Sequence, residues 1–126
     1  HYNEFLEVGK GWKWVDDINF RISDGSEVFA THGISADGLK LAMQYGKNIV
    51  QGHFHSKFNI QYFSNPDNLI WSMSCGCLTK QSSLAFQYAR NFRMRFVIGT
   101  GAIIDGHPKL FAMQMDKHGR WTGEIV

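Results

Sequence analysis

The sequence predicts an α/β fold, a layered α/β sandwich with a mixed sheet, in which the second half is mostly antiparallel strands. Two observations predict this class. Two short apolar segments, Glu27–Thr31 and Asn48–Gln51, flank an amphipathic stretch, which is the strand, helix, strand order of a parallel crossover unit. In the rest of the chain, strand-like segments follow one another with turn sequences between them, as in antiparallel hairpins.

The composition is that of a single globular domain covering residues 1–126. Hydrophobic residues make up 44% of the chain and charged residues 19%, a balance that argues against a disordered protein. A chain of 126 residues can bury one core but is short for two domains. The net charge of +2 is too small to indicate a nucleic-acid-binding protein by itself. No run of about 18 apolar residues occurs, so we expect no membrane contact.

The chain before the crossover unit contains a helix end and a strand. We expect Tyr2–Val8 to be the end of a helix that stops at Gly9, and Trp14–Ile22 to be a strand. The dipeptide Asp24-Gly25 predicts a hairpin turn into the next strand, Glu27–Thr31. This hairpin supplies the first of the two strands that the crossover joins.

A helix is expected between the two crossover strands, at Ala36–Tyr45. Apolar residues form a stripe in this stretch, and Gly46 is the residue type that favours the end of a helix. Asn48–Gln51 is then a short buried strand that ends at Gly52. The crossover places this strand parallel to Glu27–Thr31.

The second half of the chain is expected to be mainly antiparallel strands. Asn59–Ser64 and Leu69–Ser74 flank a turn sequence and form a second hairpin. Ser82–Asn91 is expected to be a helix or an ordered loop. The other expected strands are Arg93–Ile104, Lys109–Met115 and Arg120–Ile125, with turns at Asp105–Pro108 and Asp116–Gly119.

Cys75 and Cys77 are separated by a single glycine. This spacing is poor for zinc binding and strained for a disulfide. We therefore expect both thiols to be reduced and to lie on a strand. Reduced thiols favour a cytoplasmic location, which is the host cytoplasm if the protein is encoded by a phage.

Histidines that follow the two crossover strands indicate the chemistry. Thr31-His32-Gly33 ends the first strand, and Gly52-His53-Phe54-His55 ends the second. The carboxyl ends of such strands lie side by side, at the edge where α/β proteins bind ligands. Imidazole is a ligand for Zn, Mn, Fe and Ni, and glycine lets metal or phosphate approach the main chain. We predict divalent metal binding by His32, His53 and His55, and substrate contact at Gly33 and Gly52.

These two motifs resemble the last two metal motifs of the calcineurin-like metallophosphoesterases. The similarity covers roughly Glu27–Met115, and its segment Ile104–Leu110 is similar to the tail hairpin of the compact, phage-type members. The resemblance implies a site with two metal ions, in which His32 and His53 serve one ion and His55 serves the other. It also implies hydrolysis of a phosphomonoester or phosphodiester by a metal-activated water, and the candidate substrates include nucleotides and nucleic acid.

The earlier motifs of that family do not occur upstream of the two histidine motifs in this sequence. They are Asp-x-His, Gly-Asp-x-x-Asp and Gly-Asn-His-Asp/Glu, which supply carboxylate and Asn ligands and a catalytic histidine. His1 would be that histidine only if it ended a Gly-Asn-His motif, and a tag residue is the other interpretation. The catalytic residue is otherwise unassigned. We interpret the chain as the C-terminal half of such a domain, whose activity requires an upstream segment on the same gene product or another chain.

Three interpretations of function remain open from the sequence. The first is a metal-dependent phosphoesterase, or the metal-binding C-terminal part of one. The second is a degenerate, non-catalytic phosphoesterase-like module for binding or assembly, which the absent Asp motifs favour. The third is a mononuclear three-histidine zinc protein of unrelated fold. We also expect a homo-oligomer, or a partner segment that covers the missing half, because half of a sandwich leaves sheet surface or an edge uncovered.

Other polar residues have mainly structural interpretations. His107 and His118 lie in turn sequences, and His107 would at most line the mouth of the substrate site. A basic cluster could meet phosphate or nucleic acid, although a solvated strand face is its simpler interpretation; it contains Arg90, Arg93 and Arg95.

Overall fold

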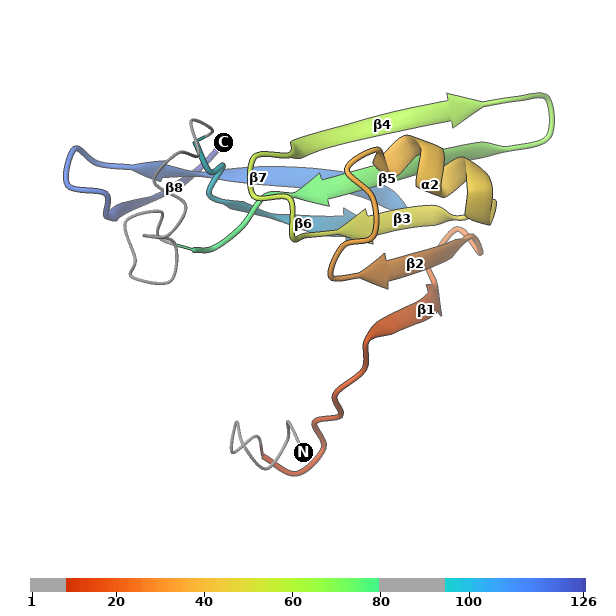
Figure 1. Ribbon diagram of the computed structural model, residues 1–126, viewed down its shortest axis with the longest axis horizontal. Helices are drawn as coiled ribbons and strands as arrows, with labels where there is room; N and C mark the ends of the chain where they lie inside the picture. The colour runs from red at the N-terminus through yellow and green to blue at the C-terminus, as the bar shows by residue number, and fades with distance from the viewer. Residues whose placement is uncertain (1–8, 80–94) are drawn as a thin grey trace.

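The computed structural model describes residues 9–79 and 95–126, which form two sheets and a short helix (Figure 1). The first sheet has the spatial order β1-β2-β3-β5-β4. Its strands are β1 (Asp17–Arg21), β2 (Glu27–Thr31), β3 (Asn48–Gln51), β4 (Phe58–Ser64) and β5 (Leu69–Cys75). The second sheet is antiparallel and contains β6 (Gly99–Ile104), β7 (His107–Met115) and β8 (Trp121–Ile125). The helix α2 (Gly38–Tyr45) connects β2 to β3.

The predicted fold class, a layered α/β sandwich, is wrong. The described residues form eight strands in two sheets and one helix of eight residues, so the fold is β-rich. The prediction assumed that the single crossover belonged to a repeating pattern of strands and helices. In the structure, β3 is followed by the β4–β5 hairpin instead of a second crossover helix. The two other expected helical stretches, Tyr2–Val8 and Ser82–Asn91, lie outside the described residues.

The predicted crossover unit is present. β2 and β3 are parallel, with Val28 opposite Asn48. The helix between them begins after Asp37, whose carboxylate accepts a hydrogen bond from the main-chain N–H of Lys40 at 3.0 Å. It ends at Gly46, which has a φ of +61° and caps the helix in the left-handed conformation. β5 also runs parallel to β3, so the carboxyl ends of β2, β3 and β5 lie at one edge of the sheet.

The two faces of the five-stranded sheet are covered by different layers, because side chains alternate along each strand. α2 packs on one face and forms a buried apolar cluster of Phe29, Leu41, Ala42 and Ile49. The β6–β7 hairpin packs on the other face, where the cluster consists of Val28, Trp71 and Met73, with Ile103 and Leu110 against it. The core therefore lies on both sides of the sheet and supports the central strands.

Close contact between the two sheets depends on Gly101. A Cβ atom at this position would lie 2.8 Å from Cys75 Sγ and 2.9 Å from Met73 Sδ, so only glycine fits without a shift. Burial raises the pKa of the Cys75 thiol, which keeps the thiol protonated. Cys75 and Cys77 are both free thiols, and Cys75 ends β5.

The observed hairpins differ from the predicted ones mainly at the strand ends. β1 begins at Asp17 instead of Trp14, and β6 begins at Gly99 instead of Arg93. The turn between β6 and β7 has only two residues, Asp105 and Gly106, with φ of 50° and 79°. Two positive φ values define the tight hairpin turn for which Asp-Gly is a favoured pair.

Candidate metal centre

His32 and His53 lie together at the carboxyl ends of β2 and β3. Each follows its strand closely, and the two strands are parallel neighbours. His32 Nε2 is 3.0 Å from His53 Nδ1, within hydrogen-bond distance. The ring centroids are 4.9 Å apart and the ring planes meet at 68°. The structure therefore brings together two of the three histidines that the sequence predicted as metal ligands.

The glycines beside these histidines allow the approach. A Cβ atom at Gly33 would lie 2.5 Å from His53 Cβ, a distance that real side chains essentially never show. A Cβ atom at Gly52 would lie 3.5 Å from the nearest atom, the carbonyl oxygen of His32, which is an ordinary contact. The N–H of Gly52 donates to the same oxygen at 3.0 Å. Gly33 thus makes room for the second histidine, and Gly52 links the two loops through its main chain.

His53 occupies a backbone conformation that side chains rarely adopt. Its φ is +62°, in the left-handed region, where a non-glycine residue costs roughly 1–2 kcal/mol. The turn around it is tight, since the N–H of Phe54 donates to Gly52 O at 2.6 Å and that of Lys57 donates to Phe54 O at 2.7 Å. Strain of this kind concentrates at functional sites. Here it turns the His53 ring toward His32.

Gln51 holds the loop that carries His32, and the sequence analysis did not identify it. Its side chain is 1% exposed. Its amide nitrogen donates to Ser35 O at 2.6 Å, and its amide oxygen accepts from the N–H of Ile34 at 3.3 Å. The available signal was a polar residue at the end of a strand with an apolar centre, directly before Gly52. A buried polar side chain must find partners, and here those partners are the main chain of the neighbouring loop.

His55 is near the pair but is oriented differently. Its half-buried ring packs edge-on against Phe96, with centroids 4.6 Å apart and planes at 81°. Burial, followed by the fields of His53 and His32, lowers the pKa of His55 and favours the neutral imidazole. Among residues 9–79 and 95–126, no three His, Cys, Asp or Glu side chains are grouped so that they could hold a metal ion. His55 therefore does not complete the pair in this conformation.

The structure does not bring His107 to this site. His107 begins β7, beside the β6–β7 turn, at the end of the sheet where β2 begins. Its charge contributes to the lowered pKa of Asp24, whose main cause is the hydrogen bond from the Ser26 hydroxyl at 2.6 Å. His118 lies in the β7–β8 turn, where its N–H donates to Asp116 Oδ1 at 2.8 Å. His1, Arg90 and Arg93 lie outside the described residues, and Arg95 is exposed.

The separation of the two histidine nitrogens is close to that of two ligands of one metal ion. An ion held tetrahedrally at about 2.0–2.1 Å from each nitrogen would place the two nitrogens about 3.3 Å apart. The observed separation of His32 Nε2 and His53 Nδ1 is 3.0 Å, so binding requires the nitrogens to move apart by a few tenths of an ångström and the rings to turn until both lone pairs point at the ion. Both rings are exposed, so an ion from solvent can reach them. Without metal, one ring donates its N–H to the other.

Comparison with known proteins identifies no family for this chain. No family model matches the sequence, and neither a curated protein nor a solved structure matches the chain. The resemblance to calcineurin-like metallophosphoesterases therefore stays a prediction based on residues 31–33 and 52–55. Within the two described ranges, the structure has no helix of the length and apolar character needed to cross a membrane.

Proposed function

We propose that this chain binds a divalent transition metal ion through His32 and His53 and contributes the histidine part of a phosphoesterase metal centre. The supporting observation is the 3.0 Å approach of His32 Nε2 to His53 Nδ1. Two neutral imidazoles on neighbouring strand ends suit Zn, Mn, Fe or Ni. The tight packing of Gly33 on His53 and the positive φ of His53 also support a built site, because both features accompany the close approach of the two rings.

The remaining ligands would come from water, substrate, a partner segment or another chain. When bound, a divalent ion supplies a Lewis acid for the phosphate oxygens and a water of lowered pKa. His32 and His53 orient the ion, and Gln51 fixes the loop after His32 through Ser35. His55 is the candidate ligand for a second ion, since its lowered pKa favours the neutral imidazole, which is the form that binds metal. Its ring would have to turn from Phe96 toward the pair.

The substrate class in this proposal is a phosphate ester, including nucleotides or nucleic acid, and it follows from the resemblance of the two histidine motifs. We place the activity in the cytoplasm, where the free thiols of Cys75 and Cys77 would stay reduced. The second candidate is a non-catalytic binding or assembly module. It is supported by the composition of the site, in which the described residues place no carboxylate with the histidine pair.

Metal binding is tested by titrating the full chain with Co²⁺ and Zn²⁺ and following the visible absorption of bound Co²⁺. We expect His32→Ala and His53→Ala each to weaken binding by more than about 100-fold, because even substitutions beyond the ligands cost about 10–100-fold. His107→Ala is the matched control, a histidine outside the site, and should bind as the unaltered chain does. Equal binding by all four proteins would contradict the proposal.

Catalysis is tested separately with bis(p-nitrophenyl) phosphate and Mn²⁺. Turnover that His32→Ala and His53→Ala remove, and that His107→Ala leaves intact, would support the phosphoesterase. Metal binding without turnover, with the chain alone or with a partner supplying carboxylates, would support the non-catalytic module. The two assays together therefore distinguish the two candidate functions.

A further inference from the structure

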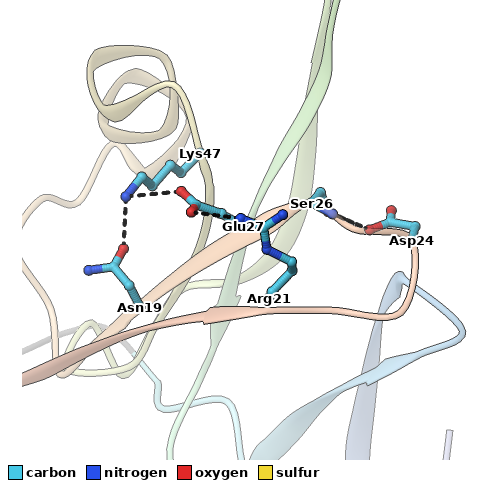
Figure 2. Close-up of polar contacts among 6 residues, drawn as sticks. All are labelled: Asn19, Arg21, Asp24, Ser26, Glu27 and Lys47. Atoms are coloured by element: carbon cyan, nitrogen blue, oxygen red, sulfur yellow. Dashed lines mark hydrogen bonds and ion pairs between the residues drawn. The ribbon is translucent and has the colours of Figure 1, made fainter.

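Strand β1 is an open edge of the five-stranded sheet. Among residues 9–79 and 95–126 it pairs only with β2, and all five of its residues are exposed. A polar network fixes it to its neighbours (Figure 2). Lys47 Nζ lies 3.1 Å from Asn19 Oδ1 and 3.2 Å from Glu27 Oε2, and Arg21 Nη2 lies 3.6 Å from Glu27 Oε1. β1 is therefore held by β2 and by these side chains, and no described residue pairs with its outer edge.

The main-chain groups on that outer edge belong to alternate residues. The N–H of Ile22 donates to Ser26 O at 3.0 Å and the carbonyl of Ile22 accepts from Gly25 at 2.9 Å, so both groups of Ile22 face β2. In an antiparallel ladder this orientation repeats every second residue. Ile18 and Phe20 therefore also bond to β2, and the N–H and C=O groups that face the open edge are those of Asp17, Asn19 and Arg21.

The sequence of β1 suits antiparallel pairing with a second copy of the same strand. Read in either direction, Asp-Ile-Asn-Phe-Arg runs charged, apolar, polar, apolar, charged, with opposite charges at its two ends. In an antiparallel pairing centred on Asn19, Asp17 faces Arg21 of the second copy, and Ile18 faces Phe20. Opposite charges and apolar pairs directly across two strands are stabilising. Exposed charges on an edge usually discourage pairing, but in this register they attract.

We propose that this chain forms a two-fold symmetric dimer in which two β1 strands pair antiparallel about Asn19 and join the five-stranded sheets into one continuous sheet. The register places the outward N–H and C=O groups of Asp17, Asn19 and Arg21 opposite one another, as the ladder requires. Two Asp17–Arg21 ion pairs form by symmetry. Arg21 is 70% exposed and has five donors, so it can bond the second copy while it contacts Glu27.

Apolar surface around β1 extends the proposed interface. Ile18 is 50% exposed and Phe20 is 37% exposed, on the face opposite α2. The segment before β1 carries the exposed side chains of Trp12 and Trp14 and runs away from the body of the chain (Figure 1). Antiparallel pairing directs this segment along the β1–β2 hairpin of the second copy. It adds apolar contact to a strand pair that alone is smaller than a usual stable interface.

The dimer leaves the two histidine pairs independent. His32 lies beyond Thr31, which pairs with Asp17 at the start of β1. In the antiparallel dimer the starts of the two β1 strands point in opposite directions, so the histidine pairs would be separated by about 20 Å along the strands, or six residues. The dimer therefore supplies no metal ligand, and its failure would say nothing about metal binding.

Sedimentation velocity of the full chain over a series of concentrations tests the dimer. We expect a species of twice the 14.4 kDa chain mass. Asn19→Pro should weaken it by at least about tenfold, because proline removes an outward N–H at the centre of the pairing. The variant should stay folded, since proline is tolerated on an edge strand when its nitrogen faces solvent. Phe20→Pro, at an inward N–H, should instead unfold β1 and lower the thermal midpoint.

A charge exchange tests the register. Asp17→Arg and Arg21→Glu should each weaken self-association by about tenfold, because each replaces two attractions with two repulsions. An equimolar mixture of the two variants should form a heterodimer, in which every facing pair is again opposite in charge. Lys109→Glu, an exposed reversal on β7, is the matched control and should dimerise normally. Thermal midpoints check that Arg21→Glu still folds without its contact to Glu27.

Three outcomes would overturn the proposal. The unaltered chain could sediment as a monomer at every concentration, Asn19→Pro could dimerise as the unaltered chain does, or the mixture could form no heterodimer. A dimer that survives all β1 substitutions would instead place the contact on another surface, such as the β4 edge, and would equally exclude pairing through β1.

Discussion

A histidine next to a glycine lies at each end of the five-stranded sheet, but among the described residues only one end brings two histidines together. His32 and His53 follow parallel neighbouring strands, and their ring nitrogens lie 3.0 Å apart. At the other end, His107 follows the Asp105-Gly106 hairpin turn and begins β7, near Asp24. A hairpin joins two consecutive strands that run in opposite directions, so it does not place the carboxyl ends of both strands side by side. The parallel crossover, and not the histidine–glycine dipeptide, therefore creates the candidate site.

Both ends also contain a non-glycine residue with positive φ. At the hairpin end it is Asp105, in a turn type in which aspartate is common. At the end with the histidine pair it is His53, for which this conformation is unusual. The hairpin end is therefore locally relaxed, whereas the end with the histidine pair retains strain.

The largest effect is expected from Gly33→Ala. The added Cβ would lie 2.5 Å from His53 Cβ, so the two loops must separate. We expect Co²⁺ affinity to fall by more than about 100-fold and the free energy of unfolding by about 1–3 kcal/mol. Gly52→Ala, whose Cβ meets only His32 O at 3.5 Å, is the matched control and should change both values little. If the two alanine variants bind Co²⁺ alike, the packing of Gly33 on His53 is not what forms the site.

A smaller change in the free energy of unfolding, of opposite sign, is expected from His53→Gly. Glycine relieves the left-handed strain, so the free energy of unfolding in urea should rise by up to about 1 kcal/mol while metal binding is lost. Asp105→Gly at the hairpin end should give a smaller gain and leave metal binding intact. A His53→Gly variant less stable than the unaltered chain would show that the His32–His53 hydrogen bond outweighs the strain.

The smallest effect is expected at Asp24. Hydrogen bonds from Ser26 hold the pKa of this carboxyl below its usual value of 3.8. A lowered pKa stabilises the folded state above pH 3.8, and this contribution disappears as the pH falls through the folded pKa. Asp24→Asn should therefore lower the thermal midpoint slightly at neutral pH, and the gap should close in strong acid. A gap that is constant with pH would show that the charge of Asp24 is not its cause.

Local elements of the fold could be predicted from the sequence. The bounds of β2 and β3 are confirmed, as are their parallel pairing and the helix cap at Gly46, because apolar runs and glycine positions are local signals. The fold class could not be predicted in this way. It depends on the β6–β7 hairpin packing behind the sheet, and that contact is made by Gly101 against sulfur atoms distant in the sequence.

The candidate site was predictable in part for a similar reason. The placement of His32 and His53 at the same edge of the sheet follows from strand order. The position of His55 does not, because its ring contacts Phe96, which is 41 residues further along the chain. The role of Gln51 depends on the exact path of residues 34 and 35, which periodicity cannot specify. The pairing of β2 with β3 was therefore readable from the sequence, and the orientation of the side chains at their ends was not.

The contact of Met73 with Gly101 also determines how susceptible the protein is to oxidation. Met73 Sδ is sealed between the two sheets, and Met73 is 1% exposed. Peroxide can reach this sulfur only when the sheets separate, and the polar sulfoxide that results no longer fits against Gly101. Oxidation of Met73 would thus require the sheets to separate, and the sulfoxide would then prevent them from packing fully again.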